Sequence, residues 1–291
     1  MKISKAEKIG NVILTVFMLV IAFVCLYPLI YVFSASISSV EDVLKGTVVL
    51  LPKNVTFAAY KKVFENPMIG TGYLNAIYYT VVGTLIQLFV TTLGAYPLSK
   101  PRLKGRRIIN FMVVFSMWFS GGMIPTYLTL VDYGMVNNRW GILLGFACTA
   151  YNVIILRTFF TSVPMELEEA ARIDGAGHWR TLWQIYLPLS KAAYATLALM
   201  YGIGRWNGYV WAMILLNKEE LQPLQVILKK IIVDTTFGGA TGGSGADSVV
   251  NYSEQMIVYA VIVVSTLPML VAYPFVQKYF KKGMMLGSVK G

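Results

Sequence analysis

Few side chains in this sequence are spaced for chemistry of their own. The 291 residues include one histidine, His178, and two cysteines, Cys25 and Cys148, which both lie in apolar runs. A thiol in such a run packs as a small hydrophobic group. The sequence has no Cys-x-x-Cys, His-Glu-x-x-His or Walker lysine pattern. We therefore expect no disulfide, no metal, no catalytic residue and no cofactor bound by this chain.

The most unusual charged residue is Arg205, which lies within an otherwise uncharged apolar stretch. An arginine inside a membrane span costs about 2.5–3.5 kcal/mol, so it must face a polar partner or an aqueous cavity. Its neighbours are aromatic or polar: Tyr201, Trp206, Asn207, Tyr209 and Trp211. These six residues could line a passage for a polar solute. Alternatively, a second subunit neutralises Arg205, and Gly204 and Gly208 let two helices pack closely.

A second set of candidate residues lies in the connection 161–190. Pro164 suits the first turn of a helix. The apolar stripe of this helix would be Leu167, Ala170 and Ala171, beside Glu166 and Glu169. The run Asp174-Gly-Ala-Gly177 then breaks the helix. A second amphipathic helix would carry Trp179, Leu182, Trp183 and Tyr186 on one face and end at Leu187-Pro188. The pattern predicts a small helical knob.

The composition indicates which environment holds these residues. Hydrophobic residues make up 56% of the chain, charged residues 13%, and the mean hydropathy is +0.62. These values exclude a disordered chain and argue against a soluble globular protein. Six stretches are long enough to cross a bilayer: 11–34, 74–99, 108–131, 140–156, 192–216 and 255–277. We predict an all-α, polytopic membrane protein with six transmembrane helices.

The net charge of +11 follows from membrane topology. With the N-terminus inside, sixteen Lys and Arg residues fall on the inner connections and eight on the outer ones. Because cationic loops stay cytoplasmic, we expect both termini in the cytoplasm. The basic residues are scattered between apolar runs, which argues against nucleic acid as a partner. The first stretch is too long for a signal peptide and should be an uncleaved anchor.

Two outer loops, 35–73 and 217–254, should carry short helices. In the first, Phe57, Tyr60, Val63 and Phe64 recur at helical spacing behind a possible Thr56 cap. In the second, an amphipathic stretch over 224–231 precedes the glycine-rich tract 237–246. The remaining connections are the inner segment 161–190 and a cytoplasmic tail, 278–291.

The inner segment resembles a known motif. Glu169-Ala170-Ala171, then Gly175, then Ile185-x-Leu187-Pro188 match the EAA motif of ABC importer permeases at its defining spacings. The chain looks closest to the six-span second permease of maltose-type carbohydrate importers. The segments 96–105, 138–143, 206–207 and 287–291 are similar as well. Arg205 and the long glycine-rich outer loop depart from that pattern.

The resemblance implies a single permease domain, 1–291, with the type I ABC importer permease fold in the bacterial cytoplasmic membrane. It implies a second homologous permease, two ATPase subunits that use ATP and Mg, and an extracytoplasmic solute-binding protein. The cargo would be a sugar or oligosaccharide, or alternatively a peptide or another small solute. Gly239, Gly242 and Gly243 would contact the binding protein. The chain would form half of the path for cargo and would not itself be an enzyme.

The resemblance also implies roles within the inner segment. The residues that couple to the ATPases would be Glu169, Ala170, Ala171, Asp174, Gly175, Ile185, Leu187 and Pro188. Glu169 would supply a charge for a basic residue of the ATPase, and the alanines would permit close approach. Gly175 would let the chain turn where a side chain would obstruct it. The alternative is a helical hairpin lying on the surface with solvated carboxylates.

Other transport classes fit the sequence less well. A proton- or sodium-coupled carrier normally buries Asp, Glu or His in its spans, and the six apolar stretches contain none. An intramembrane enzyme needs a nucleophile with a base, or a metal. The sequence therefore favours a permease that depends on partners for energy.

Overall fold

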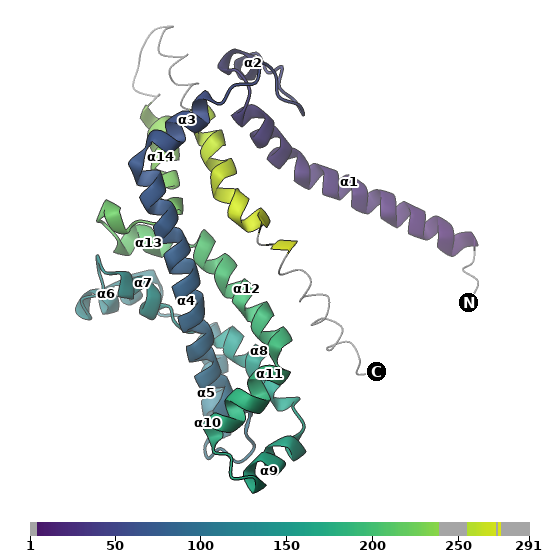
Figure 1. Ribbon diagram of the computed structural model, residues 1–291, viewed down its shortest axis with the longest axis vertical. Coiled ribbons are helices and arrows are strands. Elements are labelled where there is room, and N and C mark those ends of the chain that lie inside the picture. Colours follow the sequence, from purple (N-terminus) through teal and green to yellow (C-terminus); the bar gives the residue numbers. More distant parts are fainter. Residues whose placement is uncertain (1–4, 239–254, 272, 275–291) are drawn as a thin grey trace. The chain divides into compact units, whose positions relative to one another are not determined.

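The computed structural model describes residues 5–238, 255–271 and 273–274, which are helical apart from turns and short connections (Figure 1). The predicted all-α class is confirmed over these residues. The described chain divides into two compact units. The first draws on residues within 1–69 and 228–267, and the second on residues within 70–227 and 268–291. The single domain 1–291 stays a prediction.

The first unit begins with α1 (Lys5–Ser36), a helix of 32 residues whose apolar side chains are largely exposed. The following segment, with α2 (Val40–Leu44), folds back onto the end of α1. The Ser34 hydroxyl donates to the Leu50 carbonyl at 2.6 Å, and Ser36 and Tyr60 share a hydrogen bond of 2.8 Å. In the helix Gln255–Val271, Tyr259 makes an edge contact with Tyr31, at 6.1 Å between ring centroids.

The helix predicted behind Thr56 is present as α3 (Ala58–Glu65), and the Ala58 amide donates to the Thr56 hydroxyl. Its predicted apolar face is only partly right. Val63 is buried, whereas Phe57 and Phe64 are exposed, and Tyr60 shares its hydrogen bond with Ser36 of α1. The second predicted amphipathic stretch begins α14 (Leu224–Gly238), and its apolar side chains from 224 to 228 are buried as expected.

The second unit is organised along α4 (Pro67–Ser99), a helix of 33 residues (Figure 1). Two pairs follow it: α5 (Arg106–Trp118) with α6 (Met123–Asp132), bent by 114°, and α7 (Arg139–Gly145) with α8 (Ala150–Thr161), bent by 49°. The glycine-containing turn before α6 includes Gly122 at φ +86°, a conformation that favours glycine. The stretch 108–131 is therefore not one straight helix.

The chain then forms the inner segment, followed by two helices that are separated at residues 208–209. The inner segment comprises α9 (Met165–Ile173), α10 (His178–Thr181), a π-helical turn η1 (Leu182–Tyr186) and α11 (Leu187–Leu189). It leads into α12 (Lys191–Asn207) and α13 (Val210–Leu215), and the 3-10 turn η2 (Glu219–Leu221) precedes α14. Two described helices, Lys8–Ser36 and Pro67–Ser99, are long and apolar enough to cross a membrane, and each bent pair could form one further span. Six spans and cytoplasmic termini stay predictions.

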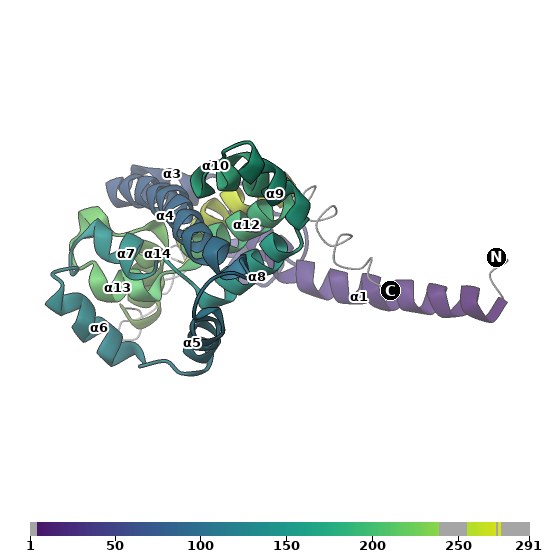
Figure 2. The same ribbon diagram turned by 90° about the horizontal axis from the view of Figure 1, so that it is seen from below.

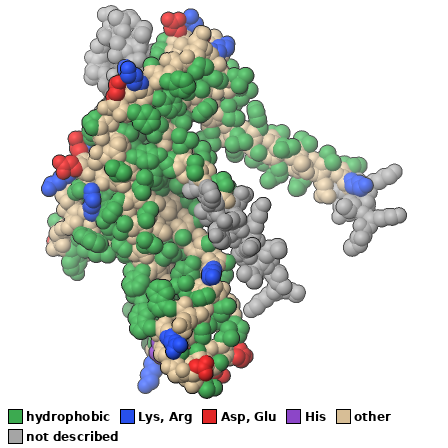
Figure 3. Space-filling view, in the orientation of Figure 1, with side chains coloured by type: hydrophobic (Ala, Val, Ile, Leu, Met, Phe, Trp, Pro, Cys, Tyr) green, Lys and Arg blue, Asp and Glu red, His purple; other side chains and the backbone are tan. Residues whose placement is uncertain are grey.

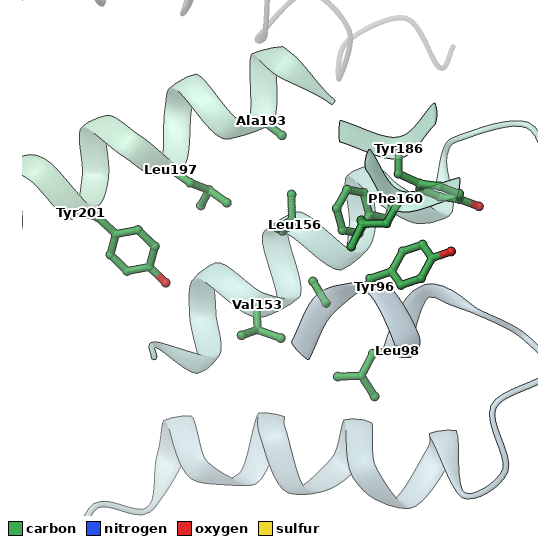
Figure 4. Packing of buried hydrophobic residues seen from close by; sticks show 11 residues of the cluster. Tyr96, Leu98, Val153, Leu156, Phe160, Tyr186, Ala193, Leu197 and Tyr201 are labelled. Atoms are coloured by element: carbon green, nitrogen blue, oxygen red, sulfur yellow. The ribbon is translucent and has the colours of Figure 1, made fainter. Parts of the chain in front are cut away.

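The core around α8 holds this unit together. The helix α8 packs against both α5 and α12 (Figure 1 and Figure 2). Figure 4 shows Leu156 and Phe160 of α8 pointing toward side chains of α12, the end of α4 and η1. Phe160 makes edge contacts with Tyr96 and Tyr186, with centroids 6.2 and 5.5 Å apart. This core joins the inner segment to the helices beside it.

The break between α7 and α8 leaves the last carbonyls of α7 without helical donors. Arg205 of α12 supplies the missing donors. Its Nη2 donates to the Phe146 carbonyl at 2.9 Å and to the Leu143 carbonyl at 3.3 Å, and its Nη1 donates to the Ile142 carbonyl. Gln87 of α4 completes the arrangement, since its Oε1 accepts from Arg205 Nε at 3.0 Å and its Nε2 donates to the Phe146 carbonyl at 2.8 Å.

Arg205 therefore caps the C-terminal end of α7. Backbone carbonyls within an apolar region must find donors inside the protein, and a guanidinium offers five in a fixed plane. Neither sequence interpretation anticipated this partner, which is the chain's own backbone. Gly204 lies against open space and Gly208 lies at the break after α12, so within the described residues they pack no second helix.

The cap depends on a glycine of α4. A Cβ atom at Gly83 would lie 3.0 Å from Arg205 Nε, whereas a Cβ at Gly94 would lie 3.7 Å from Val153, which is an ordinary contact. We expect Gly83→Ala to lower the free energy of unfolding by about 2 kcal/mol, because it displaces the guanidinium from buried carbonyls. Thermal unfolding of the purified protein in detergent measures this.

Gly94→Ala is the matched control on the same helix. It should change the stability by less than about 1 kcal/mol and can increase it, because alanine favours helix over glycine. Equal stabilities of Gly83→Ala and Gly94→Ala would show that the position of the guanidinium is not important for the fold.

Candidate functional site

The inner segment 161–190 turns at Gly175, as its sequence predicts. Gly175 has φ +77°, and the Ala176 amide donates to the Ala171 carbonyl at 2.8 Å, which closes the end of α9. The expected reason was partly wrong, since an added Cβ would meet nothing within 4 Å. Glycine is favoured here by the left-handed backbone and not by a lack of space.

The second predicted helix of the segment is not a single amphipathic helix. The π-helical turn η1 widens the coil between α10 and α11, and the predicted stripe divides. Leu182 and Tyr186 are buried, whereas Trp179 and Trp183 are 61% and 54% exposed. The described chain thus presents two large aromatic side chains outside its own core. Ile185 and Leu187 are half-buried and Pro188 is exposed.

The residue that anchors α9 is Glu168, which the sequence analysis missed. Its Oε2 accepts from Lys100 Nζ at 2.7 Å and from the Tyr186 hydroxyl at 2.9 Å. Arg172 Nη2 lies 3.7 Å from its other oxygen. Lys100 Nζ also lies over the rings of Tyr96 and Tyr186, at 4.2 and 3.6 Å from their centroids. Lys100 directly follows α4, so this cluster ties α9 and η1 to the end of that helix.

Burial and hydrogen bonding oppose each other in this cluster. Burial alone would raise the pKa of Glu168, but the hydrogen bonds from Lys100 and Tyr186 and the nearby cations hold that pKa below its ordinary value. Burial, together with the hydrogen bond to Glu168, raises the pKa of Tyr186. Burial lowers the pKa of Lys100 against the pull of Glu168. Glu168 is therefore ionised and Tyr186 is a neutral donor at neutral pH.

The opposite side of α9 is not covered by the part of the chain that the structure describes. Leu167 is 42% exposed and Ile173 is 88% exposed, and Ala170 is exposed as well. Glu169 is exposed and reaches Arg102 only at 3.9 Å, and Asp174 is exposed at the end of the helix. Figure 3 shows charged and apolar side chains side by side at the lower end of the molecule, where Figure 1 places α9. The apolar stripe predicted for α9 thus faces outward, and the face turned inward carries a carboxylate.

A second candidate site is a cavity of about 500 Å³ beside the Arg205 cap. Five of the six residues predicted around Arg205 line it: Tyr201, Arg205, Asn207, Tyr209 and Trp211. The sixth, Trp206, is buried instead and packs edge-on against Tyr73 at 5.8 Å between centroids. The lining includes further polar and aromatic residues that the sequence analysis missed: Tyr79, Gln87, Phe146, Thr149, Tyr151 and Asn152.

A chain of hydrogen bonds orders the polar wall of this cavity. Asn152 donates to Thr149 at 3.4 Å, Thr149 donates to the Tyr201 hydroxyl at 3.2 Å, and Tyr201 shares a bond of 2.6 Å with Thr91. The signal that could have found part of this wall is the presence of two amides, Gln87 and Asn152, in apolar stretches. Hydroxyl and amide groups beside exposed aromatic rings can hold a hydroxyl-rich solute.

Several predicted positions cannot be compared with this geometry. Gly239, Gly242 and Gly243, and the tail 278–291, lie outside the described residues. The predicted contact of the three glycines with a binding protein stays a prediction.

Known proteins resemble this chain along nearly its whole length. The permease protein YtcP of Bacillus subtilis, described as part of a polygalacturonan/rhamnogalacturonan transport system, is 41% identical over 94% of this chain and 96% of its own length. The protein LplC of Bacillus subtilis is 40% identical over 99% of this chain and 97% of its own length. A crystal structure of a bacterial ABC transporter involved in import of the acidic polysaccharide alginate includes a chain with a TM-score of 0.87 and 46% identity.

That structural match covers 95% of this chain and 98% of the other. Residues 4–286 match the family described as "Binding-protein-dependent transport system inner membrane component". The match agrees with the family that the EAA motif indicates. The chain therefore belongs to this family of binding-protein-dependent transport permeases and has the type I ABC importer permease fold.

Proposed function

We propose that this permease imports an acidic oligosaccharide, lines half of its path, and couples to ATPase subunits through the outward face of α9. The observation that carries the proposal is the arrangement of α9, with a buried ion pair on one side and an uncovered apolar face on the other. A second homologous permease, two ATPase subunits that use ATP and Mg, and an extracytoplasmic solute-binding protein complete the assembly. Its place is the bacterial cytoplasmic membrane, with six spans and both termini inside.

The coupling surface comprises Leu167, Glu169, Ala170, Ile173, Trp179 and Trp183. Apolar and aromatic side chains of this kind are the usual anchors of a protein interface. Glu169 beside them can pair with a basic residue of an ATPase. The surface is stiff, because the hydrogen bonds of Glu168 hold α9 to the end of α4. A movement of the ATPase can thus reach α4 without being absorbed by the connection.

The path proposal is supported by the cavity beside Arg205. Asn207, Tyr209 and Trp211 line it and are not part of the Arg205 cap, so their side chains are better placed for cargo. We assign Arg205 mainly to the cap. Three groups it donates to are carbonyls of this chain, which leaves few of its donors for a passing solute.

The cargo proposal is supported by similarity. Polygalacturonan and alginate, which appear in the descriptions of two relatives, are both polymers of sugar acids. The polar and aromatic lining of the cavity suits such a chain of hydroxyl groups. A peptide or another small solute is the alternative, since the same lining could accept its amide groups.

The outward face of α9 can be tested without disturbing its anchor. We expect Leu167→Gln and Ile173→Gln to weaken retention of the ATPase subunits about tenfold each, because each change removes an apolar anchor from an interface. Glu166→Gln, an exposed neighbour outside the proposed surface, is the control. Co-purification from membranes and ATP-driven uptake measure the effect. Full retention in both variants would contradict docking at this face.

Two adjacent glutamates should behave differently. Glu168→Gln leaves Lys100 buried without a counter-charge, so we expect a loss of about 3 kcal/mol in the free energy of unfolding. Glu169→Gln should change the stability by less than about 0.5 kcal/mol, because its pairing is exposed. It should still weaken ATPase retention. Lys100→Met combined with Glu168→Gln should recover part of the stability, and a stable Glu168→Gln would contradict the anchor.

Variants of the adjacent residues Asn207 and Trp206 should distinguish a role in the cargo path from a role in packing. Asn207→Ala should slow uptake of an acidic oligosaccharide about fivefold through one lost hydrogen bond, without loss of stability. Trp206→Ala should cost about 3–5 kcal/mol in stability, because it empties a packed site. Uptake is measured in proteoliposomes that contain both permeases, the ATPases and the binding protein. Neutral oligosaccharide and peptide serve as comparison cargoes, and equal uptake of the peptide would contradict the sugar assignment.

A further inference from the structure

A second cavity, of about 460 Å³, lies between the end of α4 and the inner segment. Its charged lining comprises Lys100, Arg102, Glu168 and Arg172, with His178 beside them. Its apolar lining includes Leu93, Trp179 and Leu182. Of the proposed coupling surface, Trp179 alone lines this cavity, so neither that surface nor the family assignment accounts for the charged part of the space.

The charges of this cavity favour an anion. Three cations face one carboxylate, and the oxygens of that carboxylate are already approached by Lys100, Tyr186 and Arg172. Among the described residues, Arg102 makes a distant contact with Glu169, at 3.9 Å, in which both side chains are more than half exposed. Such an exposed pair contributes little, so the guanidinium of Arg102 can turn toward a ligand. The lining of the cavity therefore carries more positive than negative charge.

An apolar groove of about 180 Å³ adjoins this cavity and runs along α4. Leu85, Leu88, Phe89 and Thr92 form one side of it, and Trp183, Leu187 and Tyr194 form another. Leu93, Trp179 and Leu182 line both spaces, so the groove and the charged cavity meet at these residues. The helix α4 is long and apolar enough to span a membrane. A groove along α4 would therefore extend from the charged cavity toward the hydrocarbon region of the bilayer.

We propose that the two spaces together bind one anionic phospholipid. The phosphate of the headgroup lies against Arg102, with Arg172 and His178 nearby, and an acyl chain lies in the groove between Leu93 and Leu85. Basic pockets beside membrane helices bind anionic headgroups, and tryptophans such as Trp179 are typical of the membrane interface. A free phosphate would leave the groove empty. An acidic peptide would fill the charged cavity but gain nothing from the groove.

The bound lipid would bridge α4 and α10 next to the Glu168 ion pair. It would stabilise the same joint that the proposed coupling requires, so anionic lipid would regulate ATP-driven transport. Binding of the lipid does not depend on which cargo is carried. The lipid proposal can therefore fail while the proposals for the cargo and for ATPase docking hold, and the reverse is also true.

The experiment uses the complete transporter in nanodiscs that contain phosphatidylglycerol with a photoreactive acyl chain. Mass spectrometry then locates the labelled residues. We expect labels on 85–93 and 179–183, at least about fivefold more than with a phosphatidylcholine probe, which corresponds to one basic contact. Arg102→Gln should lower the labelling about fivefold. Leu93→Trp, which fills the junction of the two spaces, should lower it as well.

Arg107→Gln is the matched control, since Arg107 lies nearby in the first turn of α5 and outside both spaces. It should leave labelling unchanged. Equal labelling by phosphatidylcholine, or no effect of Arg102→Gln, would overturn the proposal. Full displacement of the probe by inorganic phosphate would assign the cavity to a small anion instead. If labelling appeared only after removal of the ATPase subunits, the cavity would be assigned to a contact with those subunits instead.

Discussion

The arrangement of the second unit depends on one constraint, that carbonyls freed by a broken helix must find donors. The break after α7 leaves carbonyls of an apolar stretch without helical donors, and within a bilayer such groups need donors from the protein. Arg205 of α12 and Gln87 of α4 provide the donors, and Gly83 leaves room for the guanidinium. Three elements are thereby joined at one point. The cavity with Asn207 and Tyr209 lies beside this point, so the bond that stabilises the break also shapes the proposed path.

The helix α4 connects this cap with the inner segment. Gln87 belongs to the cap, and Lys100, immediately after the helix, holds Glu168. The two residues are thirteen positions apart, which corresponds to about 20 Å along a helix. Both contacts are hydrogen bonds between charged or amide side chains with little exposure. Such bonds fix the relative positions of two helices more strictly than apolar contacts do. We infer that α4 is the element through which a movement of the inner segment would reach the path.

The inner segment shows why a motif does not by itself define a surface. Glu168 and Glu169 are adjacent, yet one is buried against Lys100 and the other is exposed. The buried carboxylate is stabilised by donors from two other elements, so it sets the rotation of α9. That rotation exposes Leu167 and Ile173, which an isolated amphipathic helix would have turned inward. The same rotation places Glu168 and Arg172 in the wall of the charged cavity beside Arg102.

The sequence by itself determined the class of protein and the local turns. Composition indicated a membrane protein, helical spacing indicated α3, and the glycine at 175 indicated the turn after α9, because each depends on residues close together in the chain. The EAA spacing indicated the family for the same reason, since its residues lie within twenty positions of one another.

Only the tertiary structure decided the partner of Arg205, the buried glutamate and the separation of Trp206 from the cavity. Arg205 bonds to residues 62 and 118 positions away, and Glu168 bonds to a residue 68 positions away. Helical periodicity describes which residues share a face, but it contains no information about which distant donor meets that face. The burial of a charge is set by such donors, and they come together only when the helices pack.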